Sequence, residues 1–482
     1  MLTRQTTRRI DLPALVVGMG LALGVGFSQP HGLWLVTAVV VAMLSVAGYA
    51  LAPEGAILSL VVVRPVVDVY VYRFSLAGVN LGMLWAGLMA AFCVLYLLTH
   101  VSSLSRVSHR LAAPSLFLAL LVALTFTRPG TMAAATDALK VGTWLILTVT
   151  IAAIASRSEG RARVLRFMGY AAIVTATTIL VLVFQNRFGA AFYAHALTYE
   201  QDAGPHGLAF AAVTVLPFVL LGVLKERKTI IPLIVAGVLS LEVVLSYVRS
   251  AYFGFAVIML AFSVIALKGS RLRTRIIGVG VWVLVAAVGY YVQDELVKRW
   301  LDLLGKNAES MPDSSGSGRN LIWSAVWHQS LATPLRTTLG AGSEASIRYS
   351  IHAGLGDLWS HNDLLEVLAS GGVVLVCGYL VLLLWMGQAA VGVARMKIAD
   401  WPSRSFGILA LATVVGFFLM SFTNGILFSL PETTFMGVLV GVCYGFTAQS
   451  GTELAPTRGS AGGTSLVPSA PVTAARTFMS LE

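Results

Sequence analysis

Long apolar runs alternate with short polar connections along most of the chain, and this alternation predicts a bundle of membrane-spanning helices. A bilayer core needs about 20 mostly apolar residues per helix, which is the usual length of these runs. No acidic residue, lysine or arginine occurs from Leu12 to Pro53, and the turn-like residues 29–32 divide this stretch into two spans. Further spans are predicted at residues 80–99, 111–127, 138–156, 166–185, 206–224, 229–247, 250–267, 276–292, 363–388, 405–424 and 433–449.

Residues 54–72 begin as an apolar run but then carry Arg64, Pro65 and Asp68, which is compatible with a short span or with an interfacial element. The basic residues favour a span, because short cytoplasmic loops retain Lys and Arg. If the segment crosses, both termini and the main basic connections lie inside, with 21 of the 33 Lys and Arg residues. We therefore expect an all-α polytopic membrane protein with about 12–14 transmembrane helices and one long extracytoplasmic loop.

Composition supports this class. Hydrophobic residues make up 57% of the chain and charged residues only 11%, which excludes a soluble multidomain protein and a disordered chain. We expect the net charge of +11 to reflect membrane topology and contact with anionic lipids, not nucleic acid. Cys93, Cys377 and Cys443 lie inside apolar runs, so neither a disulfide framework nor a cysteine metal site is indicated.

The polar stretches divide the chain into four expected parts. These are an N-terminal transmembrane bundle at 1–292, an extracytoplasmic loop at 293–361, C-terminal transmembrane helices at 362–449 and a disordered cytoplasmic tail at 450–482. The loop contains tryptophans as well as charges, so we expect it to fold against the outer membrane face. The arginines before the first apolar run imitate a signal peptide, but we interpret this run as a retained first span.

The strongest candidate for chemistry is Ser360-His361-Asn362-Asp363, at the start of a predicted membrane helix. Ser360 and Asp363 have the spacing of a capping box, so one interpretation is a well-capped helix whose His and Asn face the lipid headgroups. The other is that His361 is an acid, a base or a hydrogen-bonding group, placed where a helix N-terminus favours an anion such as a diphosphate. Signatures of ATP-driven transport, zinc proteolysis, serine hydrolysis and metal-nucleotide transfer do not occur.

Several arginines lie in predicted outer segments. Arg249 follows a serine-containing span end; it either snorkels to the interface or holds a phosphate with its planar donors. The long loop adds Arg319, Arg336 and Arg348. Singly, each of these loop residues is expected to be a solvated or structural group. Together they place several cations on the side where the positive-inside tendency disfavours them.

The order of these parts resembles the bacterial O-antigen ligases and the related O-antigen and exopolysaccharide polymerases. The resemblance rests on many spans, an Arg after a Ser-rich span end, one long outer loop opening with Ser-Gly-Arg (317–319), a Gly-x-Gly (340–342) and His-Asn at a helix start. A glycine follows ten residues after Asn362. The sequence departs from the ligase pattern at Leu375 and in the stretch between Pro334 and Gly340.

This resemblance implies a metal-independent, cofactor-free glycosyltransferase of the cytoplasmic (inner) membrane, with its active site facing the periplasm or exterior. The donor would be a glycan on undecaprenyl diphosphate, and the acceptor a saccharide or the lipid A core. His361 would take or steer the acceptor hydroxyl proton, Asn362 would orient it, and Arg249 would stabilise the leaving diphosphate during inversion at the anomeric carbon. The residues expected to bind substrate are Arg319, Arg336, Arg348 and Asp363. Ligation and polymerisation stay equally open.

Two other interpretations remain. In the first, the base is Asp68 in the first outer loop, beside Arg64 and Arg73. In the second, the chain is a transporter or flippase of the same lipid-linked saccharide. The charges lining its pathway would then be Asp137, Lys140, Glu242 and Arg249.

Overall fold

The computed structural model of the chain describes residues 45–70, 75–76, 79–105, 107–108, 111–128, 131–184, 205–225, 230–246, 248–268, 275–283, 286–287, 317–356, 360–396, 401–428 and 430–453, together with Met43, Leu272 and Tyr290.

This part of the chain is predominantly helical. Its helices are α3 (Pro53–Tyr70), α4 (Leu81–Thr99), α5 (Val101–Ser105), α6 (Ala112–Phe126), α7 (Thr131–Ala155), α8 (Ser158–Phe184), α10 (Pro205–Lys225), α11 (Ile230–Leu245), α12 (Arg249–Lys268), α14 (Ser317–Ser330), α15 (Pro334–Leu339), α16 (Ala345–His352), α17 (Asp363–Ala394), α18 (Trp401–Ser421) and α19 (Leu430–Glu453). Two-residue strands β1 (Ser75–Leu76) and β2 (Val79–Asn80) pair antiparallel between α3 and α4, with Ser75 opposite Asn80.

Seven helices in the described ranges, α4, α7, α8, α10, α12, α17 and α18, are long and apolar enough to cross a membrane. Shorter apolar helices cover 112–126, 230–245 and 433–448. The protein is therefore an all-α polytopic membrane protein, as the sequence predicts. The two spans expected within residues 12–53 lie outside the described residues except for the last few positions, so the total of 12–14 stays a prediction.

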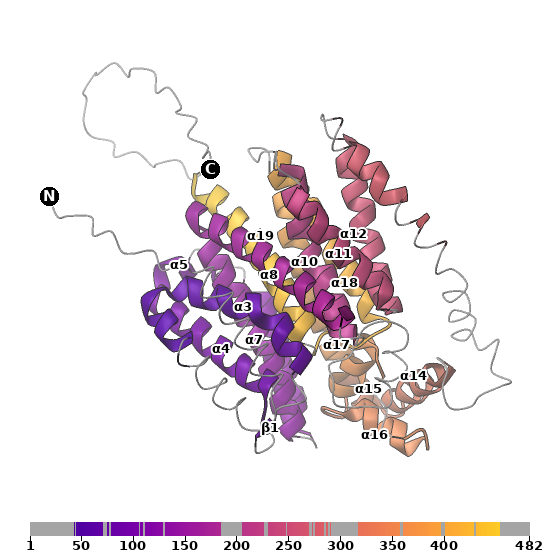
Figure 1. The fold of residues 1–482 in the computed structure, drawn as a ribbon. Coiled ribbons are helices and arrows are strands. Elements are labelled where there is room, and N and C mark those ends of the chain that lie inside the picture. The colour runs from indigo at the N-terminus through magenta and orange to yellow at the C-terminus, as the bar shows by residue number, and fades with distance from the viewer. Residues whose placement is uncertain are drawn as a thin grey trace.

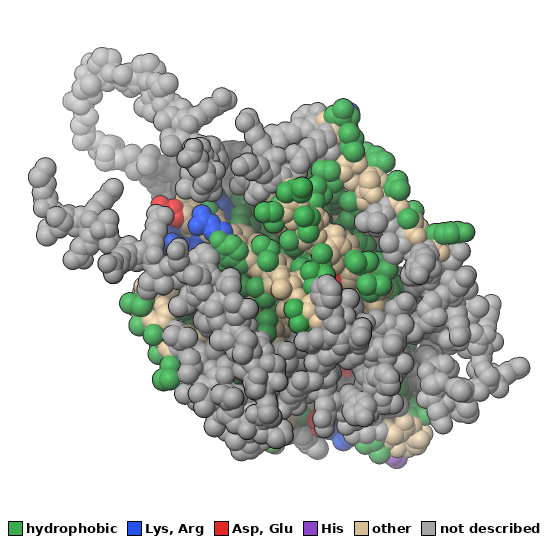
Figure 2. Space-filling view, viewed as in Figure 1, with side chains coloured by type: hydrophobic (Ala, Val, Ile, Leu, Met, Phe, Trp, Pro, Cys, Tyr) green, Lys and Arg blue, Asp and Glu red, His purple; other side chains and the backbone are tan. Residues whose placement is uncertain are grey.

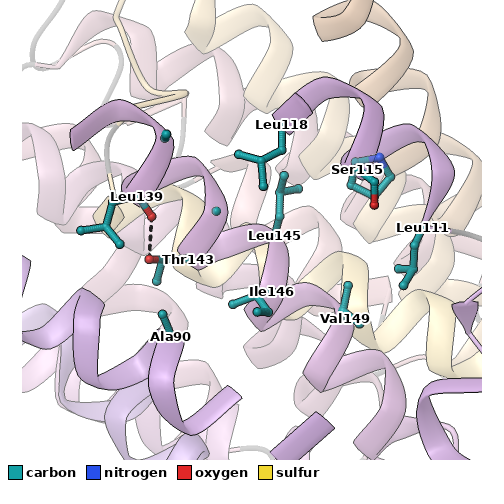
Figure 3. Close-up of a pocket in the computed structure, with 12 residues that line it drawn as sticks. Ala90, Leu111, Ser115, Leu118, Leu139, Thr143, Leu145, Ile146 and Val149 are labelled. Carbon is teal, nitrogen blue, oxygen red and sulfur yellow. Dashed lines mark hydrogen bonds between the residues drawn. The ribbon is translucent and has the colours of Figure 1, made fainter. Parts of the chain in front are cut away.

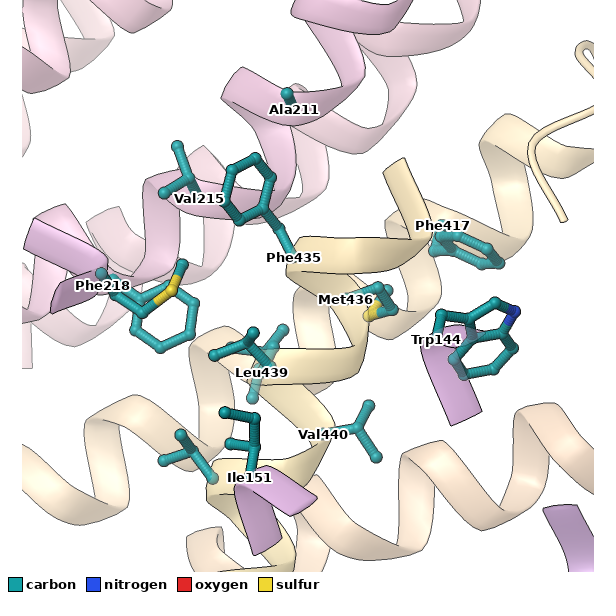
Figure 4. Packing of buried hydrophobic residues seen from close by; sticks show 14 of the residues in the cluster. Trp144, Ile151, Ala211, Val215, Phe218, Phe417, Phe435, Met436, Leu439 and Val440 are labelled. Carbon is teal, nitrogen blue, oxygen red and sulfur yellow. The ribbon is translucent and has the colours of Figure 1, made fainter. Parts of the chain in front are cut away.

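Helix α19 joins the N-terminal and C-terminal helices, since it contacts α7, α10 and α17. Figure 4 shows side chains of α19 packed among those of α7, α10 and α18. All of them are buried: Trp144, Ile151, Val215, Phe218, Phe417, Phe435, Met436, Leu439 and Val440.

A glycine stripe brings α19 close to α7. Gly437, Gly441 and Gly445 recur every four residues and all face the α7 backbone. A β-carbon at Gly441 would lie 2.6 Å from the Thr148 carbonyl oxygen, far inside normal contact. Small residues at this spacing let helices pack backbone to backbone, which drives association where no water is present to supply a hydrophobic effect.

The starts of α12 and α17 lie at one end of the bundle, which we call the site end. Near the start of α12, Gly254 packs on Gly416 and Met420, near the end of α18. The residue just after α18, Phe422, accepts a hydrogen bond from Asn362 at the start of α17. Helices α14, α15 and α16 lie together at this end, below α17 in Figure 1.

Basic residues collect at the opposite end, which we call the basic end and where α8 begins (Figure 2). Arg157 and Arg163 both pair with Glu54 at the start of α3. The predicted spans 138–156 and 166–185 leave residues 157–165 as a connection, but Arg161 and Arg163 lie in the first turns of α8. That assignment was wrong because long arginine stems can lie along a helix while their charged heads reach water.

Candidate functional site

Helix α17 is two helices joined at a break. Gly372 has φ 64° and ψ −166°, a conformation open essentially to glycine alone, so the segment 363–371 is separate from the long span that follows. The remaining 22 residues, 373–394, rise about 33 Å, which is enough to cross a bilayer core. The short segment 363–371 therefore forms a distinct structural unit at the site end.

A second glycine, Gly340, packs against the break in α17. Gly340, with φ 69°, approaches the backbone of Ser370 and Gly371, while Gly372 approaches the backbone of Thr338 and Leu339. Ala341 N donates to Ala369 O (2.8 Å) and Gly342 N to Ser370 O (2.9 Å). The loop between α15 and α16 thus satisfies carbonyls that the end of the short helix leaves open. We refer to this crossing as the glycine interlock of residues 338–342 and 369–372.

The start of α17 is fixed by Asn362. Its side-chain oxygen accepts from Leu365 N (3.1 Å), which makes it the N-cap, and its amide nitrogen donates to Phe422 O (2.9 Å). The predicted capping box from Ser360 to Asp363 is therefore wrong by two residues. Both serine and asparagine are good N-caps, so the local pattern does not choose between them.

His361 lies between two fixed neighbours. Its φ is 49°, in the left-handed region that non-glycine residues rarely occupy, and its side chain is exposed at the site end. The carbonyl oxygen of Ser360 accepts from Trp323 Nε1 of α14 at 2.6 Å, and Asn362 is held on its other side by Phe422. Such strain persists only where the surrounding structure enforces it, and it is concentrated at functional sites.

The described arginines of the loop serve different contacts. Arg348 donates to Ser343 O and Ala341 O, both at 2.7 Å, and so supports the loop of the glycine interlock. Arg336 has a long contact of 3.4 Å to Gln329 Oε1 and lies 5.9 Å from the centre of the Tyr349 ring. Burial raises the pKa of Tyr349, while Arg336 and Arg348 oppose that rise.

Arg249 and Arg319 are placed by their backbone. Arg249 is the first residue of α12, at the site end, and Arg319 is the third residue of α14. Their side chains lie outside the described part of the structure. Asp363 is fully buried, and both of its carboxylate oxygens accept from Leu427 N (3.1 and 3.0 Å), so it attaches the start of α17 to the α18–α19 connection.

Several polar residues near His361 come from distant parts of the chain. Glu366, inside the short helix, accepts from Ser346 of α16 and from Ser360. Asp137, near the start of α7, lies close enough to Lys140 and to Glu366 for their charges to interact. Glu366 is not among the predicted site residues, although a carboxylate inside an apolar helix is a functional signal in a membrane protein.

The alternative acid, Asp68, lies within α3 and not in a loop. It is 3% exposed and receives a hydrogen bond from Arg64 Nε at 3.0 Å, while the Arg64 guanidinium lies 4.3 Å from the centre of the Trp85 ring. Placing Asp68 in an outer loop was wrong because its charge was taken to end the apolar run. A charge paired four residues away within a helix does not end it.

An apolar groove runs along α7 (Figure 3). It begins at Ala138, the residue after Asp137, continues to Val149 and has a volume of about 320 Å³. Helices α4 and α6 supply the other walls, and Gly142 of α7 also lines the groove. The Thr143 hydroxyl is engaged with Leu139 O at 2.7 Å, which leaves this groove suited to a hydrocarbon chain.

Comparison with known families gives one match: the profile of the O-antigen ligase family matches residues 234–380. Residues 234–380 are therefore similar to the O-antigen ligase family. A comparison with curated proteins finds no significant match. The O-antigen ligase domain covers α11, α12, α14, α15, α16 and the first part of α17, and thus includes His361, Arg249 and the glycine interlock. The family indicates a glycosyltransferase-type role with lipid-linked glycan and polysaccharide substrates.

Proposed function

We propose that the protein joins or polymerises polysaccharide, using an undecaprenyl-diphosphate-linked glycan as donor, at the outer face of the cytoplasmic membrane. The observation that carries this proposal is the geometry of His361. An exposed imidazole is held in a strained backbone conformation at a membrane end, within the matched domain, by neighbours that contact α14 and the end of α18. A fixed imidazole next to a helix start suits proton transfer beside an anion.

The proposed reaction is a single displacement. The acceptor hydroxyl oxygen attacks the anomeric carbon, its proton passes to His361, and the bond to the diphosphate breaks with its electron pair leaving on the diphosphate oxygen. Arg249, with Arg319 and Arg336, would stabilise that charge, a role in which arginine forks are effective without a metal. Asn362 acts by holding the backbone of His361.

The distribution of basic residues supports the proposed orientation. The described arginines and lysine near the α7–α8, α12 and α17–α18 helix ends lie at the basic end, away from His361: Arg157, Arg161, Arg163, Lys268, Arg395 and Arg404. Short cytoplasmic connections retain such residues, so the basic end would face the cytoplasm and His361 the exterior.

The groove along α7 supports a polyprenyl donor in particular. It starts one residue from Asp137, whose charge acts on Glu366 of the short helix, and extends 11 residues along α7, or roughly 17 Å. The isoprenoid chain of a donor whose diphosphate lies at the site end would be able to follow this path into the membrane. We therefore propose that the groove holds that chain.

The function is tested by glycan transfer in vesicles with purified protein, lipid-linked donor and acceptor. His361→Ala is expected to lower kcat by about 10²- to 10⁴-fold, and Arg249→Ala by a similar factor. Activity is expected to persist in EDTA. Matched controls are His352→Ala, an exposed histidine at the end of α16, and Lys268→Ala at the other end of α12.

Two results would overturn the proposal. If His361→Ala transfers glycan at the wild-type rate, His361 has no part in the chemistry. If the protein moves lipid-linked saccharide across the membrane without joining it to an acceptor, it is a transporter. A deletion strain separates the two transfer types: single repeats on the core indicate a polymerase, and free lipid-linked chains indicate a ligase.

A further inference from the structure

Glu366 connects the residue before His361 to two helices. It is 5% exposed, and its Oε2 accepts from the Ser360 hydroxyl at 3.1 Å and from the Ser346 hydroxyl of α16. Ser360 is itself 1% exposed and follows directly on the loop of the long outer segment. The single carboxylate oxygen therefore joins α16, the segment leading to His361, and the short helix 363–371.

Acidic residues near Glu366 make a buried carboxylate at this position unfavourable for the stability of the fold. Asp137 from α7 and Glu344 from the start of α16 both lie near enough to repel its charge. Burying a carboxylate with like charges nearby is costly, and apolar residues of similar volume stabilise a buried site at least as well. The benefit of a carboxylate here is directional: charge-assisted hydrogen bonds fix the hydroxyl groups that donate to it.

The hydrogen bonds of Ser360 and Asn362 fix the backbone on both sides of His361. His361 is the residue with left-handed backbone between Ser360 and Asn362, and Asn362 is already fixed to Phe422 and Leu365. The backbone of Ser360 is held by Trp323 at its carbonyl, and its side chain is held by Glu366. Without Glu366 the segment before His361 would keep the Trp323 bond and the bond from the Ser360 hydroxyl to Asn362 O (3.2 Å). It would lose its attachment to α16 and to the short helix and could relax toward an ordinary backbone conformation.

We propose that Glu366 is a positioning residue for the transfer reaction: through Ser360 it holds the backbone that presents the His361 imidazole to the acceptor hydroxyl. This inference rests on the proposed function, because it takes His361 to be the group that meets the acceptor. Glu366 itself is buried and contacts no substrate in this arrangement.

The experiment is a double-mutant cycle in the vesicle transfer assay, with kcat and the donor KM measured separately. Glu366→Leu removes the acceptor of both serine bonds, and a displaced imidazole is expected to lower kcat about 10- to 100-fold with the donor KM within about twofold of wild type. Glu366→Gln keeps an oxygen that can accept from both hydroxyls and should retain most of kcat. Glu344→Gln, an exposed acid of the same cluster with no bond to Ser360, is the matched control.

The cycle distinguishes positioning from a general structural role. If Glu366 acts through His361, adding Glu366→Leu to His361→Ala lowers kcat no further than His361→Ala alone. Should Glu366→Leu fail to reach the membrane, Ser360→Ala carries the same cycle, with an expected loss of about 3- to 10-fold.

Additive losses, or wild-type kcat in both Glu366→Leu and Ser360→Ala, would overturn the positioning role. Wild-type transfer by His361→Ala would instead overturn the proposed function itself. The two failures are therefore separate.

Discussion

The glycine interlock leaves no room for a methyl group at Gly372, so Gly372→Ala should open the contact between the α15–α16 loop and α17. A β-carbon there would approach Thr338 and lie 2.6 Å from Leu339 N. Alanine at φ 64° and ψ −166° adds about 1–3 kcal/mol of backbone strain. Opening the contact relieves this strain, while the loss of the two bonds donated by Ala341 N and Gly342 N opposes opening equally in the wild type and in the variant.

The strain of about 1–3 kcal/mol therefore raises the opening equilibrium roughly 5-fold to 150-fold. Hydrogen exchange of peptides that cover residues 338–346 measures this directly, because Ala341 and Gly342 lose protection as the contact opens. The matched control is Gly387→Ala in the same helix, where a β-carbon meets nothing within 4 Å. Its exchange should be unchanged and its helix slightly stabilised.

The interlock also supports His361 through the short helix, so Gly372→Ala should lower the rate of glycan transfer while Gly387→Ala does not. Wild-type protection of residues 338–346 in Gly372→Ala would refute the reasoning. It would mean that the two backbones can separate by the width of a methyl group without losing their hydrogen bonds.

Three further changes test other parts of the structure. Gly142→Leu fills the apolar groove and should raise KM for a long-chain polyprenyl donor but not for a short-chain analogue; equal KM values for both would exclude the groove as the chain site. Gly441→Leu should lower the thermal stability of the purified protein far more than Gly169→Leu, which has nothing within 4 Å of its β-carbon, and similar melting temperatures would contradict the close packing of α19 on α7. Arg64→Leu leaves the Asp68 carboxylate buried and unpaired, at a cost of about 3–5 kcal/mol, whereas adding Asp68→Leu should recover much of that stability; no recovery in thermal unfolding would show that the pair is not the cause.

The spans were predictable because a bilayer demands long apolar runs whatever the tertiary contacts are. The prediction at 363–388 and the observed start of α17 at Asp363 agree, and 405–424 overlaps α18 almost fully. The starts of α7 and α8 were placed seven and eight residues late, at 138 and 166. Charged residues in the first turns of these helices caused this error, since a helix can continue past the bilayer where an apolar run cannot.

The site was predictable only in part. His361 and Asn362 stand out locally, because polar residues at a helix start inside an apolar sequence are unusual. The partners that fix them were not visible, since Phe422 lies 60 residues from Asn362 and Ser346 lies 20 residues from Glu366. The break at Gly372 depends on the approach of Gly340, which a single helix pattern does not contain.

The close contact between Gly340 and Gly372 also limits where this chain can be joined to a related chain in a chimeric protein. Residues 338–342 and the first nine residues of α17 are joined by two backbone hydrogen bonds and by the close approach of Gly340 and Gly372. Each segment therefore depends on the other for its conformation. A chimera that exchanges residues 317–361 must therefore take the replacement sequence through at least Gly372. A junction placed just before Asp363 would combine residues 338–342 of one protein with residues 369–372 of another. The close backbone contact between these two segments would then not be preserved.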